Sequence, residues 1–248
     1  MQIRPMVLEV IQQKKQVIES RARIREFVFG IQDGLISTVG LLAGIQGATE
    51  NRLVVIIAGF TAMFSGAISM AAGSYLSSAA QKEIFDKELR EAEALAEREP
   101  YMAAEGLLRA LGEEGLSKEQ SYRMVKVLSQ ERNVFMRTFQ EKVFGLGSAE
   151  INQPVQAALV MGLSFIVGAI VPIIPYMIAS GLTAFYISAL LGGITLFGVG
   201  AFKGKLAGKS LTLGGLEFFL VAVGAAGAGY LIGLVVQYFF PGVEIPPA

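Results

Sequence analysis

The sequence predicts an all-α polytopic membrane protein with five transmembrane helices and a cytoplasmic helical insert between helices 2 and 3. Hydrophobic residues fill 53% of the 248 positions and charged residues 17%, whereas soluble domains average roughly 45–50% and roughly 25%. The charges are also segregated: residues 77–150 hold 11 Lys or Arg and 14 Asp or Glu, but residues 27–76 and 151–248 together hold only eight charges. Because a soluble protein cannot leave so much uncharged chain in water, we expect these apolar parts to cross a lipid bilayer.

Five apolar stretches are long enough to cross roughly 30 Å of hydrocarbon as helices. They are predicted at residues 27–48, 53–76, 155–178, 182–202 and 218–240. The second is expected to continue as a helix until Pro100, because no helix-breaking residue comes earlier. Three parts follow: residues 1–80 with an N-terminal amphipathic helix and the first two spans, residues 81–150 as the cytoplasmic helical domain, and residues 151–248 with the last three spans.

Basic residues outside the spans indicate how the chain is oriented. The segments before the first span, between the second and third, and between the fourth and fifth hold 20 Lys or Arg, while the opposite side holds only Arg52. The positive-inside rule therefore predicts that the N-terminus and residues 77–150 are cytoplasmic. The first 25 residues lack the apolar core of a signal peptide, which favours a prokaryotic cell membrane over a vacuole.

Composition excludes several classes of function. The sequence contains no cysteine and no histidine, so thiolate chemistry, imidazole ligands and histidine-based catalysis are absent. The formal net charge is zero, which gives no general attraction to nucleic acid. No nucleophile–base pair, phosphate-binding loop or cofactor motif occurs, so we expect neither an enzyme nor a prosthetic group.

One charged residue, Asp33, lies well inside an apolar span. An ionised carboxylate at that depth costs roughly 2.5–3.5 kcal/mol even on lenient insertion scales, so it needs a cation, a proton or a water-filled path. Alternating spacings of four and three residues place small or polar residues along the same helix face, namely Glu26, Gly30, Asp33, Ser37, Gly40 and Gly44. This face predicts a polar path through the first span.

The second span carries a matching stripe at Met63, Gly66, Met70, Gly73 and Ser77. A carboxylate at Asp33 and a thioether at Met70 suit a divalent ion of intermediate softness such as Fe²⁺ or Mn²⁺. The alternative is packing, because methionine often fills cores and Gly30-x-x-x-Gly34 is a helix-packing motif. Pro172 and Pro175 are expected either to kink the third span or to expose its carbonyls to a cavity.

The cytoplasmic domain, residues 81–150, is predicted to be helical. Ser117 and Gln120 are spaced as in a capping box, and the helix that they begin is expected to run to Phe144. The acidic residues of this cytoplasmic domain allow two interpretations. Pairs such as Lys87 and Glu91 fit a solvated helix face, whereas a cytoplasmic metal site would use Glu88, Glu91, Glu105, Met136 and Glu141.

Four segments of the sequence resemble the vacuolar iron transporter family: REFVFGIQDGLISTVGLLAGIQGA (25–48), GAISMAAGSYLSSAAQKE (66–83), VPIIPYM (171–177) and FGVGAFKGK (197–205). The resemblance covers all five spans in order. It implies a homodimer that moves Fe²⁺, and often Mn²⁺, out of the cytoplasm in exchange for protons. It also implies that Asp33 and Met70 form the intramembrane metal site, and that Glu26 is an acidic residue nearer the cytoplasmic opening of the metal path.

The sequence departs from plant and fungal members of that family at several ligand positions. Ala62 stands where their second span has an acidic residue. In an ungapped alignment, their cytoplasmic glutamates and Met-Met-Glu cluster fall here on Ala92, Leu95, Ala103, Gly106, Phe139, Gln140 and Val143. These departures leave a second hypothesis open, in which the protein is a membrane-bound sensor or scaffold for divalent metal without transport.

Overall fold

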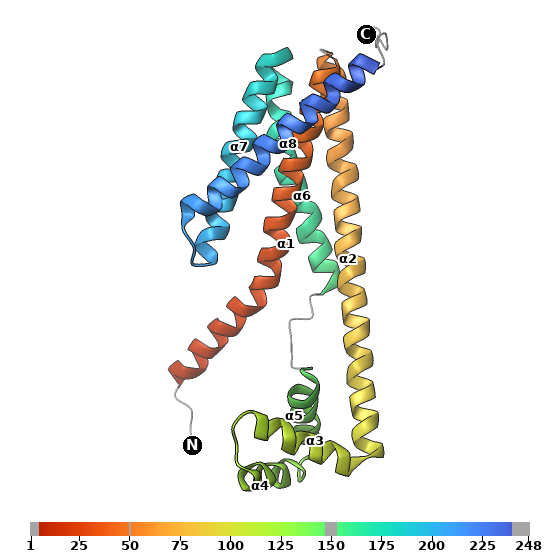
Figure 1. Ribbon diagram of the computed structural model, residues 1–248, viewed down its shortest axis with the longest axis vertical. Helices are drawn as coiled ribbons and strands as arrows, with labels where there is room; N and C mark the ends of the chain where they lie inside the picture. The colour runs from red at the N-terminus through yellow and green to blue at the C-terminus, as the bar shows by residue number, and fades with distance from the viewer. Residues whose placement is uncertain (1–4, 50, 147–152, 240–248) are drawn as a thin grey trace. The chain divides into compact units, whose positions relative to one another are not determined.

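The chain folds into α-helices throughout the residues that its computed structural model describes, which are 5–49, 51–146 and 153–239. Within the first range, side chains are described only from Ile24 onward. The amphipathic helix predicted at the N-terminus therefore lies outside the described side chains. Five helices are long and apolar enough to cross a membrane, which confirms the all-α class and the five predicted spans. The chain divides into two compact units, one formed by Met1–Tyr75 with Pro154–Ala248 and the other by Leu76–Gln153 (Figure 1).

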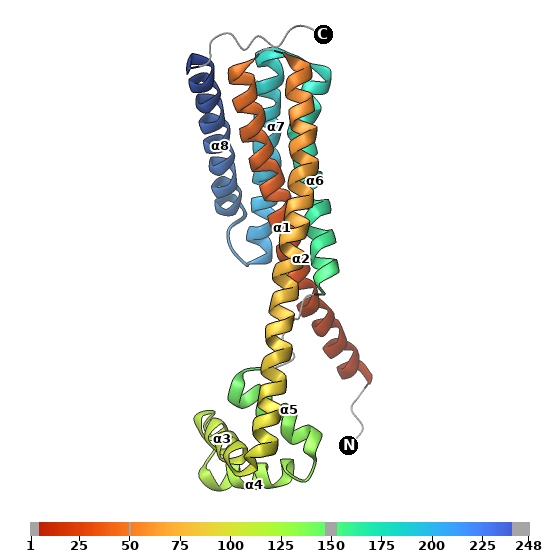
Figure 2. The ribbon, with the colours of Figure 1, turned by 90° about the vertical axis from the view of Figure 1, so that its right-hand side faces the viewer.

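The first unit, called here the membrane unit, contains the five spanning helices (Figure 2). They are α1 (Pro5–Ala48), α2 (Arg52–Arg98), α6 (Pro154–Ile178), α7 (Gly181–Leu206) and α8 (Leu211–Phe239). As predicted, α2 continues past the apolar stretch and ends just before Pro100. The start of α8 was predicted seven residues too late, because the prediction followed apolarity and began after Glu217, whereas the helix starts directly after the turn at Gly208.

Glycines let α1 lie very close to two of its neighbours. A Cβ atom at Gly34 would overlap the carbonyl oxygen of Phe165 on α6, and one at Gly168 would overlap that of Ile31. Farther along α1, a Cβ at Gly233 of α8 would overlap the carbonyl oxygen of Gly44. Small residues at helix crossings permit this backbone approach, which is the main source of packing energy between helices in lipid. Thus α1 is the central helix of the unit, with α6, α7 and α8 packed around it.

The proline pair of α6 is part of the packed interior. Pro172 and Pro175 are fully buried, and the helix continues through both to Ile178. The Ser188 hydroxyl of α7 donates a hydrogen bond of 2.7 Å to the carbonyl oxygen of Pro172. At the end of the helix, the Arg52 guanidinium donates to the carbonyl oxygens of Tyr176 (2.7 Å) and Met177. The Arg52 side chain therefore satisfies acceptors that the end of α6 leaves without helical donors, and the Ser188 hydrogen bond ties α7 to α6 beside the prolines.

The second unit, called here the helical insert, combines the last part of α2 with three shorter helices. These are α3 (Pro100–Glu113), α4 (Lys118–Leu128) and α5 (Arg132–Phe144). Two adjoining apolar clusters hold them together, one around Ala103 and Phe139 and the other around Leu107, Leu111 and Val125. The predicted capping box of α4 is present, with the Ser117 hydroxyl accepting from the backbone N–H of Gln120 at 3.3 Å and the Gln120 side chain accepting from that of Ser117 at 2.9 Å.

The single helix predicted from residue 118 to residue 144 is wrong, because the chain turns between α4 and α5. The Ser129 hydroxyl donates to the carbonyl oxygen of Lys126 at 3.0 Å, and the backbone N–H groups of Gln130 and Glu131 bond three residues back instead of four. Serine side chains compete in this way with helical hydrogen bonds. The turn lets α4 and α5 both pack on α3, which a straight helix would prevent.

Candidate functional site: a cavity between the first two spans

Asp33 and Met70, the two residues predicted to form an intramembrane metal site, line the same cavity. This cavity of about 350 Å³ lies within the membrane unit, between α1 and α2, with Phe165 of α6 forming part of its wall. Asp33 is half-buried there, as is Met70, which packs partly against the apolar core around Phe165. Residues 37 positions apart in the sequence are therefore neighbours in space, as the matching stripes on the two spans predicted.

The cavity offers donors of two chemical kinds. Asp33 supplies the only carboxylate among the lining residues and Met70 the only sulfur, while Ser37, Thr38 and Ser69 add hydroxyl groups. The Ser37 hydroxyl donates a hydrogen bond of 2.6 Å to the backbone carbonyl oxygen of Asp33. This bond fixes the hydroxyl proton and leaves the lone pairs of the Ser37 oxygen available. A carboxylate, a thioether and hydroxyl oxygens form a mixed hard and soft donor set, which suits first-row divalent ions such as Fe²⁺ and Mn²⁺.

Glu26 occupies a separate position about two turns from Asp33 along α1. It does not line the cavity, and it is buried with 5% of its surface exposed. One carboxylate oxygen accepts from the Arg25 guanidinium at 2.8 Å and the other from the Ser74 hydroxyl at 3.4 Å. Ser74 follows Met70 by four residues on α2, so the Glu26–Ser74 contact is a polar link between the two helices that border the cavity. Seven residues of helix separate Glu26 from Asp33, which corresponds to about 10 Å.

The polar stripe of α1 does not form the single face that was predicted. Asp33 and Ser37 line the cavity, but Gly30 faces α6, where a Cβ would lie 2.7 Å from the carbonyl oxygen of Met161. Gly40 and Gly44 instead meet the backbone of α8. A repeat of seven residues drifts by about 20° per repeat on a straight helix, so residues spread over 18 positions point toward different neighbours.

The other predicted small residues fall into different roles. Gly66 lines the cavity, and a Cβ there would overlap the Phe165 ring, so glycine is what allows that ring to form the wall. Gly73 meets nothing within 4 Å and thus packs against no described part of the chain. Pro172 and Pro175 do not line this cavity, and they serve the packing of α6.

The acidic residues of the helical insert do not gather into a metal site in the described part of the chain. No three acidic side chains come together anywhere in residues 24–49, 51–146 and 153–239. Glu88, Glu105 and Glu141 are exposed, and Glu91 pairs with Lys87 at 3.5 Å. Met136, the fifth residue of the suggested site, packs against the apolar cluster of the insert.

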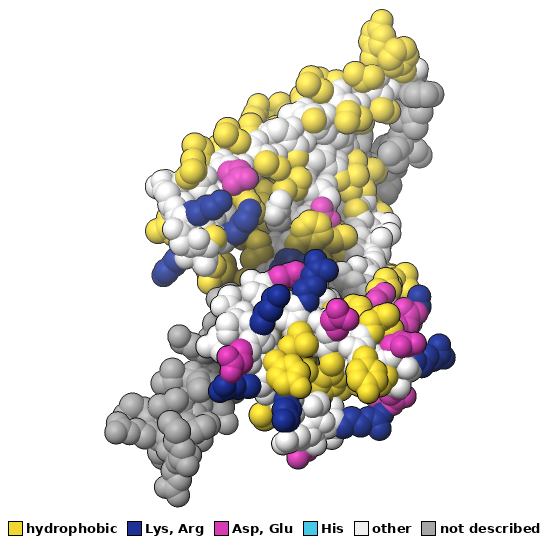
Figure 3. Space-filling model, turned by 60° about the horizontal axis from the view of Figure 1, so that its bottom comes forward, with side chains coloured by type: hydrophobic (Ala, Val, Ile, Leu, Met, Phe, Trp, Pro, Cys, Tyr) yellow, Lys and Arg dark blue, Asp and Glu magenta, His cyan; other side chains and the backbone are white. Residues whose placement is uncertain are grey.

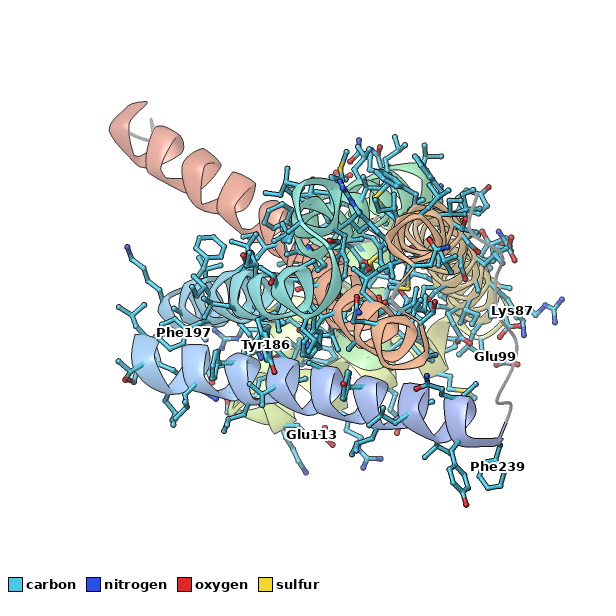
Figure 4. All side chains as sticks on the ribbon, turned by 90° about the horizontal axis from the view of Figure 1, so that it is seen from above. Lys87, Glu99, Glu113, Tyr186, Phe197 and Phe239 are labelled. Atoms are coloured by element: carbon cyan, nitrogen blue, oxygen red, sulfur yellow. The ribbon has the colours of Figure 1, made fainter. Side chains whose placement is uncertain are left out.

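Ion pairs cover the surface of the insert instead. Arg109 pairs with Glu113 at 3.0 Å, and Lys142 with Glu114 at 2.7 Å. The hydrogen bond and negative charge of Glu114 raise the pKa of Lys142 above its usual range. Figure 3 shows basic and acidic side chains interspersed over the lower part of the molecule, and in Figure 4 Lys87 and Glu113 project away from the ribbons. This is the pattern of a solvated helix surface.

Five lining residues were not predicted to belong to the site: Thr38, Leu41, Ala62, Ser69 and Phe165. Ser69 carried a signal that was available in the sequence, because it lies three residues after Gly66 just as Met70 lies four after it, and both spacings share a helix face. Phe165 carried none, since one phenylalanine in an apolar span resembles any other. Its place in the wall depends on how closely α6 packs on α1 and α2.

Fold and cavity together define the class: a five-span helical membrane protein with an acid-bearing cavity inside its spans. The family model described as "VIT family" matches residues 24–234, so the chain belongs to the VIT family. This confirms the resemblance to vacuolar iron transporters that the four sequence segments indicated.

Several named relatives align with most of the chain. Vacuolar iron transporter 1 of Arabidopsis thaliana is 24% identical over 216 residues, which cover 87% of this chain and 86% of that protein. Vacuolar iron transporter cccA of Arthroderma benhamiae is 29% identical over 221 residues, covering 85% and 78%. The vacuolar iron transporter of Plasmodium falciparum is 26% identical over 224 residues, covering 86% and 82%. These relatives are named as transporters, in agreement with the expectation that the chain is not an enzyme, but their vacuolar names give no support to a prokaryotic cell membrane.

Proposed function

We propose that this protein is a proton-coupled transporter that moves Fe²⁺, and also Mn²⁺, out of the cytoplasm through the cavity between α1 and α2. The observation that carries the proposal is that Asp33 and Met70 line one cavity inside the apolar spans. The family match and the names of the relatives support iron as the transported ion.

Asp33 provides the coupling between the ion and the proton in this mechanism. A carboxylate in an apolar span is costly when it is ionised and alone, so it is neutralised either by a proton or by a cation. The same oxygen atoms cannot hold both at full strength, because protonation removes the negative charge that attracts the metal. Fe²⁺ arriving from the cytoplasm displaces the proton, and a proton entering from the opposite side releases the metal.

Met70 contributes selectivity rather than charge. A thioether sulfur adds little to the binding of hard ions such as Mg²⁺ and Ca²⁺, but it binds softer transition-metal ions more favourably. Glu26 lies toward the N-terminal end of the α1 span, which the positive-inside rule places at the cytoplasmic side. Its carboxylate, held by Arg25 and Ser74, is positioned to attract cations before they reach Asp33.

The cavity is open at the surface of a single chain, which supports a homodimer. Three of its lining residues, Ser37, Leu41 and Ser69, are exposed. A polar opening toward acyl chains would leave hydroxyl groups and a carboxylate in hydrocarbon, at a cost of several kcal/mol. A second copy placed over this opening would shield it from lipid and complete the walls of the path.

Uptake into vesicles tests the proposed function. Purified protein is reconstituted with a pH-sensitive dye inside the vesicles, Fe²⁺ is added outside under reducing conditions, and metal and proton movements are recorded together. We expect Fe²⁺ to enter the vesicles that carry the protein while protons leave them. Stoichiometric binding of Fe²⁺ without any uptake would contradict transport and would favour the sensor or scaffold.

A further inference from the structure

A second cavity of the membrane unit lies between α1 and α7, apart from the cavity that holds Asp33. Its volume is about 440 Å³, within the roughly 300–1,000 Å³ of small-molecule sites. Two cations and an amide line it, Arg25, Gln32 and Lys203, and the remaining wall is apolar, formed by Ile24, Val28, Phe29, Leu206 and Ala207. The proposed transport path uses none of these side chains as a ligand for the metal.

The charges of this cavity all have one sign. No carboxylate is among its lining residues. Arg25 pairs with Glu26 through one nitrogen, but its side chain is 69% exposed, so other guanidinium donors remain free to bind. Lys203 lies over the ring of Phe218 at 4.8 Å, and none of the described acidic side chains is within ion-pair distance of it. A cation–π contact orients the ammonium group without neutralising it.

The cavity lies at the level of a membrane surface. Arg25 is the second residue of the first candidate span, Ile24–Ala48, and Lys203 is in the last turn of the fourth, Gly181–Leu206. Two more lysines, Lys205 and Lys209, follow at the same end of α7. Phe29 and Leu206 are about half exposed; Phe29 lies one turn farther into the span than Arg25, and Leu206 ends α7.

From this arrangement we propose that the cavity between α1 and α7 binds an anionic phospholipid of the adjacent leaflet. Arg25 and Lys203 hold the headgroup phosphate, Val28 and Phe29 contact the first part of the acyl chains, and Gln32, deeper in the span, donates a hydrogen bond to an ester carbonyl of the lipid. Basic pockets between spanning helices recognise anionic headgroups in this manner. A zwitterionic lipid fits less well, since its own ammonium group would meet two cations and no carboxylate.

The bound lipid links the start of the α1 span to the end of α7. Arg25 also holds the buried Glu26, so the headgroup phosphate and Glu26 share the same guanidinium. The lipid therefore affects how firmly the polar end of α1 is held. This inference does not depend on transport, because it concerns lipid binding alone.

Native mass spectrometry of the whole protein in a neutral detergent tests the proposal, with phosphatidylglycerol and phosphatidylcholine as probes. We expect one tightly retained phosphatidylglycerol per chain and at least tenfold weaker retention of phosphatidylcholine. Lys203→Gln should weaken phosphatidylglycerol binding about fivefold, as expected for one cation near an anionic lipid. Lys205→Gln is the matched control, since Lys205 is exposed and does not line the cavity, and it should change binding by less than twofold.

Two further variants keep the test decisive if Lys203→Gln folds poorly. Lys203→Arg preserves the charge and should retain the lipid, whereas Ala207→Asp places a negative charge in the cavity and should weaken binding at least tenfold. Equal losses in Lys203→Gln and Lys205→Gln would indicate general attraction to a basic surface and would overturn the proposal. Displacement of the lipid by millimolar inorganic phosphate would also overturn it, because the site would then bind the free anion.

Discussion

The membrane unit and the helical insert differ in how they use acidic residues. The insert holds most of the carboxylates of the chain, yet they are exposed, several are paired with Lys or Arg, and no three of the described ones gather. The membrane unit has few, but Asp33 lines a cavity whose other lining residues are all uncharged. This difference supports the proposal of a metal site at Asp33, because a carboxylate kept away from competing cations and bulk water remains available to a metal ion, whereas the more numerous carboxylates of the insert do not.

The largest effect on Fe²⁺ uptake is expected from removing the carboxylate of Asp33 in the membrane unit, compared with removing a carboxylate in the insert. We expect Asp33→Ala to reduce Fe²⁺ uptake into vesicles at least 100-fold, because no other acid lines the cavity. Glu91→Gln is the matched control, since this glutamate of the insert pairs with Lys87 at the surface. Asp33→Ala uptake at the wild-type rate would refute the role given to this residue.

The next largest effect is expected on the stability of the membrane unit, when a methyl group is added where α1 packs closely on α8. Gly233→Ala introduces a methyl group against the backbone of Gly44, where neither helix can move without the other, and we expect a loss of about 1–3 kcal/mol of stability. Gly73→Ala, whose Cβ would meet nothing within 4 Å, should leave the melting temperature in detergent nearly unchanged. If both variants melted at the same temperature, the close contact between α1 and α8 would not hold the unit together.

The sulfur of Met70 should affect selectivity more than rate. Met70→Leu keeps nearly the same volume, so we expect Fe²⁺ affinity to fall several-fold while the proton-dependent behaviour of Asp33 persists. Met63→Leu provides the control, because Met63 lies two stripe positions earlier on α2 but is buried in the apolar core. Competition between Fe²⁺ and Mg²⁺ during uptake measures the difference, and an unchanged preference in Met70→Leu would reduce Met70 to a packing residue.

The smallest effect is expected from the carboxylates of the insert. A combined variant with Gln at Glu88, Glu91, Glu105 and Glu141 and Leu at Met136 should retain Fe²⁺ uptake within about twofold of the wild-type protein. The reason is that these side chains face solvent or pack apolar neighbours, so they offer no shared site. A tenfold loss of uptake in this variant would show that the insert supplies metal to the path.

Much of this architecture could be predicted because lipid imposes strict local rules. The five spans followed from length and apolarity, and Asp33 was identified because a charge inside a span needs a partner. Contacts between helices were harder to predict. Which neighbour Gly30, Gly40 and Gly44 face depends on crossing angles, and the turn at Ser129 depends on packing against α3. Such features depend on how the helices pack against one another, and a spacing pattern along a single helix carries no information about that packing.

Anomalous scattering from crystals of the protein soaked with Mn²⁺ tests the central claim most directly, since it locates the ion without relying on activity. The account predicts one strong peak in the cavity between α1 and α2, within about 2.5 Å of an Asp33 carboxylate oxygen and close to the Met70 sulfur. Peaks confined to the helical insert, with the Asp33 side chain turned toward lipid, would contradict it.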